Sequence, residues 1–145
     1  MENAHGKSVF DMDANLVALL CYLGNVVCFL GLILSIVTIL QDKKNKLARF
    51  HAWQSILLTL IPFTIVIFLI LLIVIGGVLG TFVDAMIGFP IISLIMLVVW
   101  IIFYFVAIIS SLVLFVGQII AAIKGYNGEL FKLPIIGKMA DKYSG

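Results

Sequence analysis

Charged residues are scarce in this sequence, and their scarcity excludes a water-soluble globule. Only 11% of the 145 residues are Asp, Glu, Lys or Arg, whereas 64% are hydrophobic. A soluble domain contains about 25% charged and about 45–50% apolar residues. Disorder is excluded as well, because it requires low hydrophobicity together with a high net charge. The composition therefore predicts a membrane protein.

Residues for metal binding and covalent catalysis are equally few. There are two cysteines, Cys21 and Cys28, and two histidines, His5 and His51. On one helix the two cysteines would lie about 10 Å apart, beyond the limit of about 7 Å for a disulfide. We expect no metal, no other cofactor and no enzymatic activity, because hydrolysis needs a nucleophile with a base, or a metal with its ligands. A net charge of only +2 also argues against a nucleic-acid partner.

What the sequence has instead is three long stretches without charge, residues 14–41, 50–83 and 85–123. Each is longer than the ~20 apolar residues that cross a hydrocarbon core of ~30 Å. The third stretch is expected to cross once, because residues 100–106 contain no Gly, Pro, Asn or Asp that would favour a turn.

The sequence thus predicts an all-α, polytopic helical membrane protein, with residues 1–145 forming a single helical membrane domain. Its three transmembrane helices are expected at about residues 16–40, 55–79 and 91–115, the last starting just after Pro90.

The basic residues predict the orientation, because cytoplasmic loops of membrane proteins carry an excess of Lys and Arg. Four of them lie in the loop 41–49 and four more in the tail 124–145, whereas the loop around Asp84 has none. We therefore expect the loop 41–49 and the tail in the cytoplasm and the N-terminus outside. The expected location is the cytoplasmic membrane.

Small residues recur at helical spacing in the first and third spans. Helices in lipid associate through such residues and through polar contacts. We interpret these stripes as helix–helix contacts, and a groove for a partner helix or substrate is the open alternative. The residues are Cys21, Cys28, Gly31 and Ser35 in the first span, and Ala107, Ser110 and Gly117 in the third.

Two polar segments are candidates for function. In the first, Arg49, His51, Gln54 and Ser55 gather a cation, an imidazole, an amide and a hydroxyl within two helical turns. Asn25, near the middle of the first span, needs a hydrogen-bond partner and is grouped with them.

The second segment is the stretch 124–137 of the tail, which is too apolar to extend into water, with Tyr126, Phe131, Pro134 and Gly137 as its candidate residues. It is expected to lie in the cytoplasmic membrane interface or to dock against residues 41–55.

Three stretches together resemble a known family: Cys21-Tyr-Leu23, Arg49-Phe-His-Ala-Trp-Gln-Ser55, and Gly125-Tyr-Asn-Gly-Glu-Leu-Phe-Lys-Leu-Pro-Ile-Ile-Gly137. The chain is similar to small bacterial membrane proteins of unknown function related to the twenty-kilodalton subunit of Tic, the chloroplast inner-envelope translocon. The resemblance implies a helical membrane domain with a translocation-related role. The plant relatives have four predicted spans, whereas three are counted here.

The predicted function is that of a non-enzymatic integral membrane protein, a subunit or scaffold of a larger membrane complex. Its expected partners are membrane lipids and either other membrane-protein subunits or further copies of the chain. The alternative is a small-solute or ion channel or transporter that acts as an oligomer. Transport paths usually contain intramembrane ionisable groups, and the predicted spans contain none.

Overall fold

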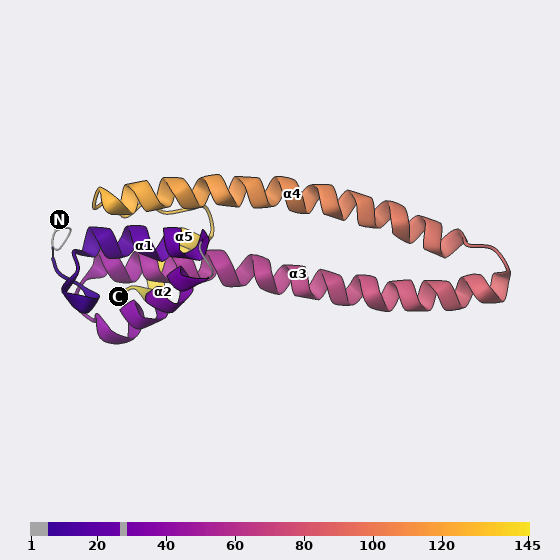
Figure 1. Cartoon of the computed structure of the whole chain (residues 1–145), viewed down its shortest axis with the longest axis horizontal. Coiled ribbons are helices and arrows are strands. Elements are labelled where there is room, and N and C mark those ends of the chain that lie inside the picture. Colours follow the sequence, from indigo (N-terminus) through magenta and orange to yellow (C-terminus); the bar gives the residue numbers. More distant parts are fainter. Residues whose placement is uncertain (1–5, 27–28) are drawn as a thin grey trace. The chain divides into compact units, whose positions relative to one another are not determined.

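The computed structural model describes residues 6–26 and 29–145, and the named elements of these ranges are all helices (Figure 1). A 3-10 helix, η1 (Val9–Asp11), precedes five α-helices. These are α1 (Ala14–Val26), α2 (Leu30–Gln41), α3 (Lys46–Ile87), α4 (Ile91–Tyr126) and α5 (Ile136–Tyr143). The prediction of an all-α protein is confirmed. Helix α4 also begins directly after Pro90, as predicted.

The chain forms two compact units. The terminal unit consists of Met1–Ile61 with Leu114–Gly145, and the hairpin unit consists of Pro62–Val113. Helices α3 and α4 contribute to both units.

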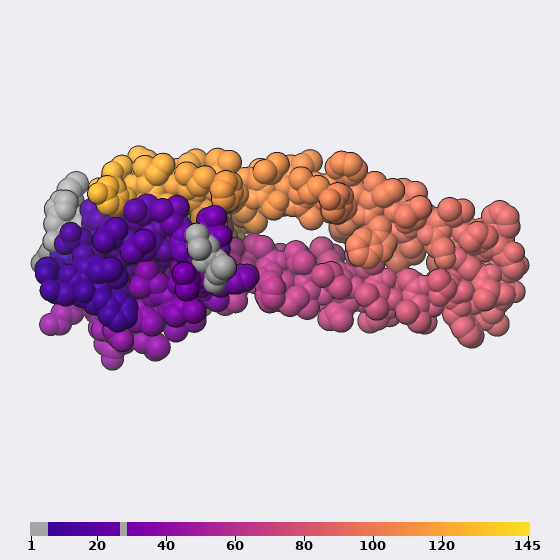
Figure 2. Space-filling view, viewed as in Figure 1, coloured from indigo at the N-terminus to yellow at the C-terminus, as the bar shows by residue number. Residues whose placement is uncertain are grey.

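The hairpin unit contains residues 62–87 of α3 and residues 91–113 of α4 (pink to orange in Figure 2). These segments are about 39 and about 35 Å long at 1.5 Å per residue, enough to cross a bilayer core. Most of their large apolar side chains are exposed. Because water does not stabilise such a surface, lipid is its natural solvent. Among the described residues, helices α3 and α4 are the two that are long and apolar enough to cross a membrane.

Asp84 fixes the turn of the hairpin unit. Its carboxylate accepts hydrogen bonds from the backbone N–H groups of Ile92 and Ser93, both at 2.8 Å, and from the Ser93 hydroxyl at 2.5 Å. These are N–H groups of the first turn of α4, which have no partner within the helix. Gly88, with φ of 76°, supplies the left-handed residue that the turn requires.

Helix α3 continues past the point where the sequence predicts the second span to end, near residue 79. The glycines there do not end the helix, and two of them, Gly76 and Gly80, face α4. A Cβ at Gly76 would lie 2.6 Å from Cε of Met96, and one at Gly80 would lie 2.9 Å from Cγ2 of Ile92. The two glycines therefore allow α3 and α4 to approach closely.

The predicted first span, residues 16–40, is wrong as a single helix. The structure has two helices of 13 and 12 residues there, about 20 and about 18 Å long and too short to cross a bilayer core. The chain doubles back between them, and α1 and α2 pack side by side (Figure 1). The physical reason is a glycine pair, since a Cβ at Gly24 would lie 2.5 Å from the backbone N of Gly31.

This reversal also contradicts the prediction that the N-terminal segment and the loop 41–49 lie on opposite sides of the membrane. The Ser8 hydroxyl donates a hydrogen bond to the Asp42 carboxylate at 2.5 Å. The side-chain amide of Asn15 donates to the carbonyl of Tyr126 at 2.8 Å. The N-terminal segment thus contacts both the loop and the tail.

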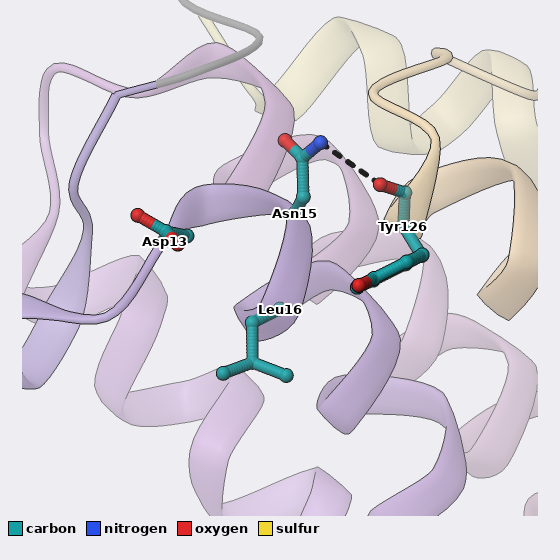
Figure 3. A pocket seen from close by; sticks show the side chains of 4 residues that line it. All are labelled: Asp13, Asn15, Leu16 and Tyr126. Atoms are coloured by element: carbon teal, nitrogen blue, oxygen red, sulfur yellow. Dashed lines mark hydrogen bonds between the residues drawn. The ribbon is translucent and has the colours of Figure 1, made fainter.

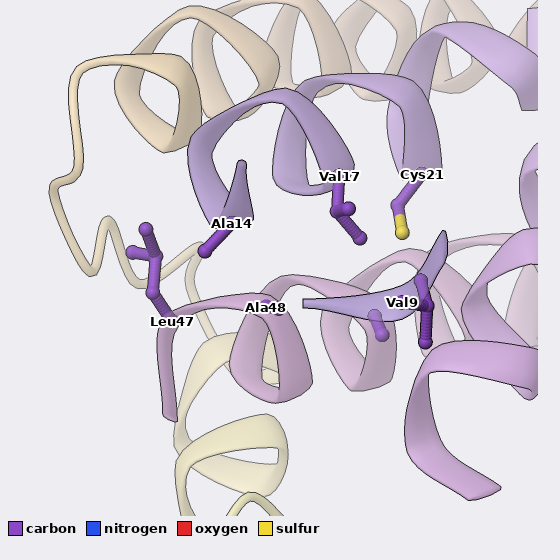
Figure 4. Packing of buried hydrophobic residues seen from close by; sticks show 7 residues of the cluster. Val9, Ala14, Val17, Cys21, Leu47 and Ala48 are labelled. Carbon is purple, nitrogen blue, oxygen red and sulfur yellow. The ribbon is translucent and has the colours of Figure 1, made fainter. Parts of the chain in front are cut away.

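Two apolar clusters form the core of the terminal unit. One joins η1, α1 and the start of α3 through small and medium-sized side chains, and the other joins α1, α3 and the end of α4. The members of the first are Val9, Ala14, Val17, Cys21, Leu47, Ala48 and Ala52 (Figure 4). The members of the second are Tyr22, Leu58, Ala121 and Ala122.

Helix α3 begins within this core because Asn45 caps it. The Asn45 side-chain oxygen accepts hydrogen bonds from the backbone N–H groups of Leu47 at 3.1 Å and Ala48 at 3.3 Å. Satisfying the free N–H groups of a first turn in this way stabilises a helix by about 1 kcal/mol.

Candidate functional site

A group of buried polar side chains lies between α1, α3 and the tail. Tyr22 on α1 and His51, Gln54 and Ser55 on α3 each have 0% of their surface exposed. Together with the half-buried Asn25 we call these five residues the polar core. Buried polar groups destabilise a fold unless they are hydrogen-bonded, so their partners decide what the polar core does.

The hydrogen bonds of His51 determine where its proton lies. Nε2 lies 3.0 Å from the carbonyl oxygen of Glu129, and because a carbonyl only accepts, Nε2 carries the proton. In the neutral form of His51, Nδ1, 2.9 Å from the hydroxyl of Tyr22, accepts a hydrogen bond from that hydroxyl. The hydroxyl in turn accepts a hydrogen bond from Nε2 of Gln54 at 2.9 Å. In this form the hydrogen bonds run in one direction, from Gln54 through Tyr22 and His51 to Glu129.

Gln54 attaches the tail to α3. Its Nε2 also donates to the carbonyl of Phe131 at 3.1 Å, and its Oε1 accepts from the backbone N–H of Leu133 at 3.2 Å. Both amide protons and the amide oxygen are thereby used. The tail thus docks against residues 41–55, which is the second of the two arrangements that the sequence predicts for it.

Asn25 joins α1 to α3 at the other end of the polar core. Its amide donates to Oγ of Ser55 at 2.7 Å and to Oγ1 of Thr59 at 3.0 Å. The Ser55 hydroxyl donates to the carbonyl of Cys21 at 2.7 Å. The predicted need of Asn25 for a hydrogen-bond partner is met within the chain.

Helix α4 joins the same site through Gln118 and Gly125. The amide of Gln118 donates to the carbonyl of Tyr22 at 2.6 Å. A Cβ at Gly125 would lie 3.1 Å from Cβ of Ala18 and 3.2 Å from Nε2 of His51. The absence of a side chain at Gly125 therefore leaves room for the imidazole.

The tail itself is held in a tight loop. A Cβ at Gly137 would lie 2.6 Å from Cα of Lys132, so this position tolerates only glycine. Beyond it, Lys132 donates a hydrogen bond to Asp141 at 2.7 Å, and the Lys46 ammonium lies 4.0 Å from the same carboxylate. The hydrogen bond from Lys132 and its charge lower the pKa of Asp141.

The predicted residues divide into those at the site and those elsewhere. His51, Gln54, Ser55 and Asn25 come together in the polar core, whereas the guanidinium of Arg49 donates to the carbonyl of Lys43 at 3.4 Å. In the tail, Phe131 packs against the second cluster and Gly137 is buried, whereas Tyr126 and Pro134 are exposed.

The predicted contact stripes divide in the same way. Cys21, Gly31 and Ser35 are buried, as expected for helix contacts. Gly117 faces the tail, since its Cβ would lie 3.4 Å from Cδ2 of Leu133. Ala107 and Ser110 are exposed and make no such contact within the described chain. Cys28 lies outside the described residues.

Sequence reasoning missed three residues of the site, Tyr22, Thr59 and Gln118. Thr59 and Gln118 are polar groups within apolar stretches, and the need of such groups for a partner is the signal that could have found them. Tyr22 gives no such signal, because its ring fits an apolar stretch without a partner for the hydroxyl.

An open cleft of about 520 Å³ lies in the terminal unit. Asp13, Asn15 and Leu16 line it from the start of α1, and Tyr126 lines it from the end of α4 (Figure 3).

Among the described residues, no group of three or more His, Cys, Asp or Glu side chains is arranged to hold a metal ion. What the polar core does chemically is to hold α1, α3, α4 and the tail together.

Comparison with known proteins gives a family and two relatives. Residues 13–140 match MamF/MmsF, described as the magnetosome magnetite crystal formation protein family. Two UPF0132 membrane proteins of Methanocaldococcus jannaschii are similar to the chain. One is 30% identical, with 96% of each chain covered, and the other is 27% identical, with 91% of this chain and 71% of the relative covered. No solved structure matches.

These findings correct the resemblance to the Tic-related proteins, which is wrong. The matched family is a different one, and the two relatives come from an archaeon. The translocation-related role and the bacterial origin rested on that resemblance and lose their support. That the chain is a membrane protein agrees with the names of both relatives.

Proposed function

The chain belongs to the MamF/MmsF magnetosome magnetite crystal formation protein family, and from this premise we propose that it is a non-enzymatic subunit of a larger membrane complex. The hairpin unit anchors the chain in the cytoplasmic membrane. The loop 41–49 and the tail, both in the terminal unit, lie on the cytoplasmic side, because Lys and Arg residues are favoured there. The family description concerns magnetite crystal formation, whereas the archaeal relatives are named only as membrane proteins.

One observation carries the proposal: Ala107 and Ser110 are exposed on α4. Small residues spaced along a membrane helix allow another helix to approach closely. Within the described chain, these two have no such neighbour, although the small residues of α1 and α2 do. A helix of another subunit, or of a second copy, would fill this position.

The polar core supports a structural rather than a chemical role. Each polar group of His51 and Gln54 is already hydrogen-bonded within the chain. A base or nucleophile needs a free position toward its substrate, and neither residue offers one.

Photo-crosslinking in native membranes tests the proposal. A benzophenone amino acid replaces Ser110 in one variant and Leu112 in the control, which is exposed on a different face of α4. The expected result is a protein adduct, to another subunit or a second copy, from position 110 and none from position 112. Lipid adducts alone from both positions would contradict the proposal.

The transporter alternative has less support, because the one charged side chain between residues 62 and 113 is Asp84, and it holds the turn. Solute flux into vesicles containing the purified protein, lowered by Asn25→Leu or Gln118→Leu, would favour that alternative over the subunit role.

A further inference from the structure

Helices α1 and α2 form an apolar hairpin whose tip has no partner within the described chain. The side chains near the tip are exposed by 42% to 59% of their surface. They are Leu23, Val26, Phe29, Leu30 and Ile33. An apolar patch of this kind on a membrane protein is covered either by protein or by lipid.

The charges are all at the other end of this hairpin. Residues 14–41 contain none, whereas Lys7, Asp11 and Asp13 precede α1 and Asp42, Lys43 and Lys44 follow α2. Because the chain reverses between the two helices, both charged segments lie at the base. The contact of Ser8 with Asp42 joins them directly.

Several polar side chains within the hairpin hydrogen-bond to the chain itself, as a hydrocarbon environment favours, whereas the side-chain oxygens of Asn15 and Asn25 are buried without a hydrogen-bond partner among the described residues. The Ser35 hydroxyl donates to the carbonyl of Gly31 at 2.6 Å, and the Thr38 hydroxyl donates to the carbonyl of Leu34 at 2.8 Å. The amide of Asn25 donates to Ser55 on α3. The tip therefore offers apolar side chains to its surroundings, and the base offers charges.

We propose that the α1–α2 hairpin is a re-entrant segment, which inserts its tip among the acyl chains of one leaflet and returns to the side it came from. Its length fits, because helices of about 18–20 Å reach past one leaflet of a ~30 Å core without crossing it. The chain then crosses the bilayer twice, through α3 and α4, and both termini lie on the side of the loop 41–49. This topology is independent of whether the protein has a partner subunit.

Cysteine labelling in membrane vesicles tests the topology. Single cysteines replace Ser8, Phe29, Ile87 or Ser144 in a background that carries Cys21→Ala and Cys28→Ala, and a membrane-impermeant maleimide is the probe. Positions 8 and 144 are expected to react only in inside-out vesicles and position 87 only in right-side-out vesicles. Position 29 is expected to react in neither until detergent is added. Reaction of positions 8 and 87 from the same side, or of position 29 in intact vesicles, would overturn the proposal.

A second measurement separates lipid from protein as the neighbour of the tip. A bimane fluorophore is attached to Phe29→Cys, or to Leu71→Cys in the hairpin unit as a control, in the purified protein within phosphatidylcholine vesicles. Phosphatidylcholine brominated in its acyl chains is expected to quench both positions to a similar extent and to leave Ser8→Cys unquenched. Quenching at position 71 but not at position 29 would mean that protein covers the tip, and would contradict the insertion.

Discussion

His51 donates a hydrogen bond from its Nε2 to the backbone carbonyl of Glu129, 78 positions further along the chain, at 3.0 Å. The contact uses the backbone of Glu129 and not its carboxylate, which pairs with Lys124 at 2.9 Å. One imidazole therefore connects α1, through Tyr22, with the segment that follows α4.

Replacement of His51 by Ala is expected to destabilise the terminal unit by about 1–3 kcal/mol, the free energy that a buried polar group costs when it loses its partner. The group is the buried hydroxyl of Tyr22, and the carbonyl of Glu129 loses its donor as well. Thermal unfolding in a mild detergent measures the effect. Glu129→Ala is the control, since it keeps the carbonyl, and equal losses from both variants would contradict the assignment.

Replacement of Gln54 by Glu is expected to release the tail. A carboxylate has the same shape as the amide, but it cannot donate to the carbonyl of Phe131 or to the hydroxyl of Tyr22. Limited proteolysis after residue 128 measures the release, and cleavage is expected to be faster than in the parent protein. In the matched variant Asn127→Asp, on an exposed position, the cleavage rate is expected to be unchanged.

Much of this site could be predicted from the sequence, because polar residues in an apolar chain are few and must find one another. The need of Asn25 for a partner follows from that argument. The docking of the tail on residues 41–55 was one of two arrangements predicted for it, because the tail is too apolar to extend into water. Tyr22 does not, because an aromatic residue in an apolar stretch fits lipid and core equally well, and only the partner of its hydroxyl distinguishes them.

The reversal between α1 and α2 could not be predicted from hydrophobicity. One span and two half-length helices are equally apolar, so composition alone does not separate them. The local signal is the pair Gly24 and Gly31, whose meaning depends on which backbone each one faces. The start of α4 was predictable because Pro90 restricts the backbone locally.

Replacement of Gly24 by Ala is expected to destabilise the α1–α2 hairpin, although alanine favours a helix by up to about 1 kcal/mol over glycine. The added Cβ would lie 2.5 Å from the backbone N of Gly31, and relieving such a clash costs about 1–3 kcal/mol. Gly77→Ala is the matched control, since a Cβ at Gly77 meets nothing within 4 Å. A lower unfolding temperature is expected for the first variant and not for the second.

The tail is expected to loosen at acid pH. Lys132 lowers the pKa of Asp141 through a hydrogen bond and its charge. A carboxyl whose pKa is lower in the folded state stabilises that state above the unfolded pKa, ~3.9, and this contribution is lost as the pH falls through the folded value. Proteolysis of the tail by an acid-active protease is therefore expected to accelerate below about pH 4. In Lys132→Gln the lowered pKa of Asp141 should return toward its ordinary value, and an unchanged pH profile would contradict this assignment.

Replacement of Asp84 by Ala is expected to fray the start of α4 without disrupting the rest of the hairpin unit. The carboxylate accepts from the N–H groups of Ile92 and Ser93, and loss of a helix cap costs about 1 kcal/mol. Hydrogen exchange at these two amides is expected to accelerate about fivefold, which corresponds to that free energy. Ser93→Ala removes only the hydroxyl contact and is expected to leave the amides of residues 92 and 93 largely protected. If both variants exposed the amides equally, the hydroxyl of Ser93 rather than the carboxylate of Asp84 would be holding the turn.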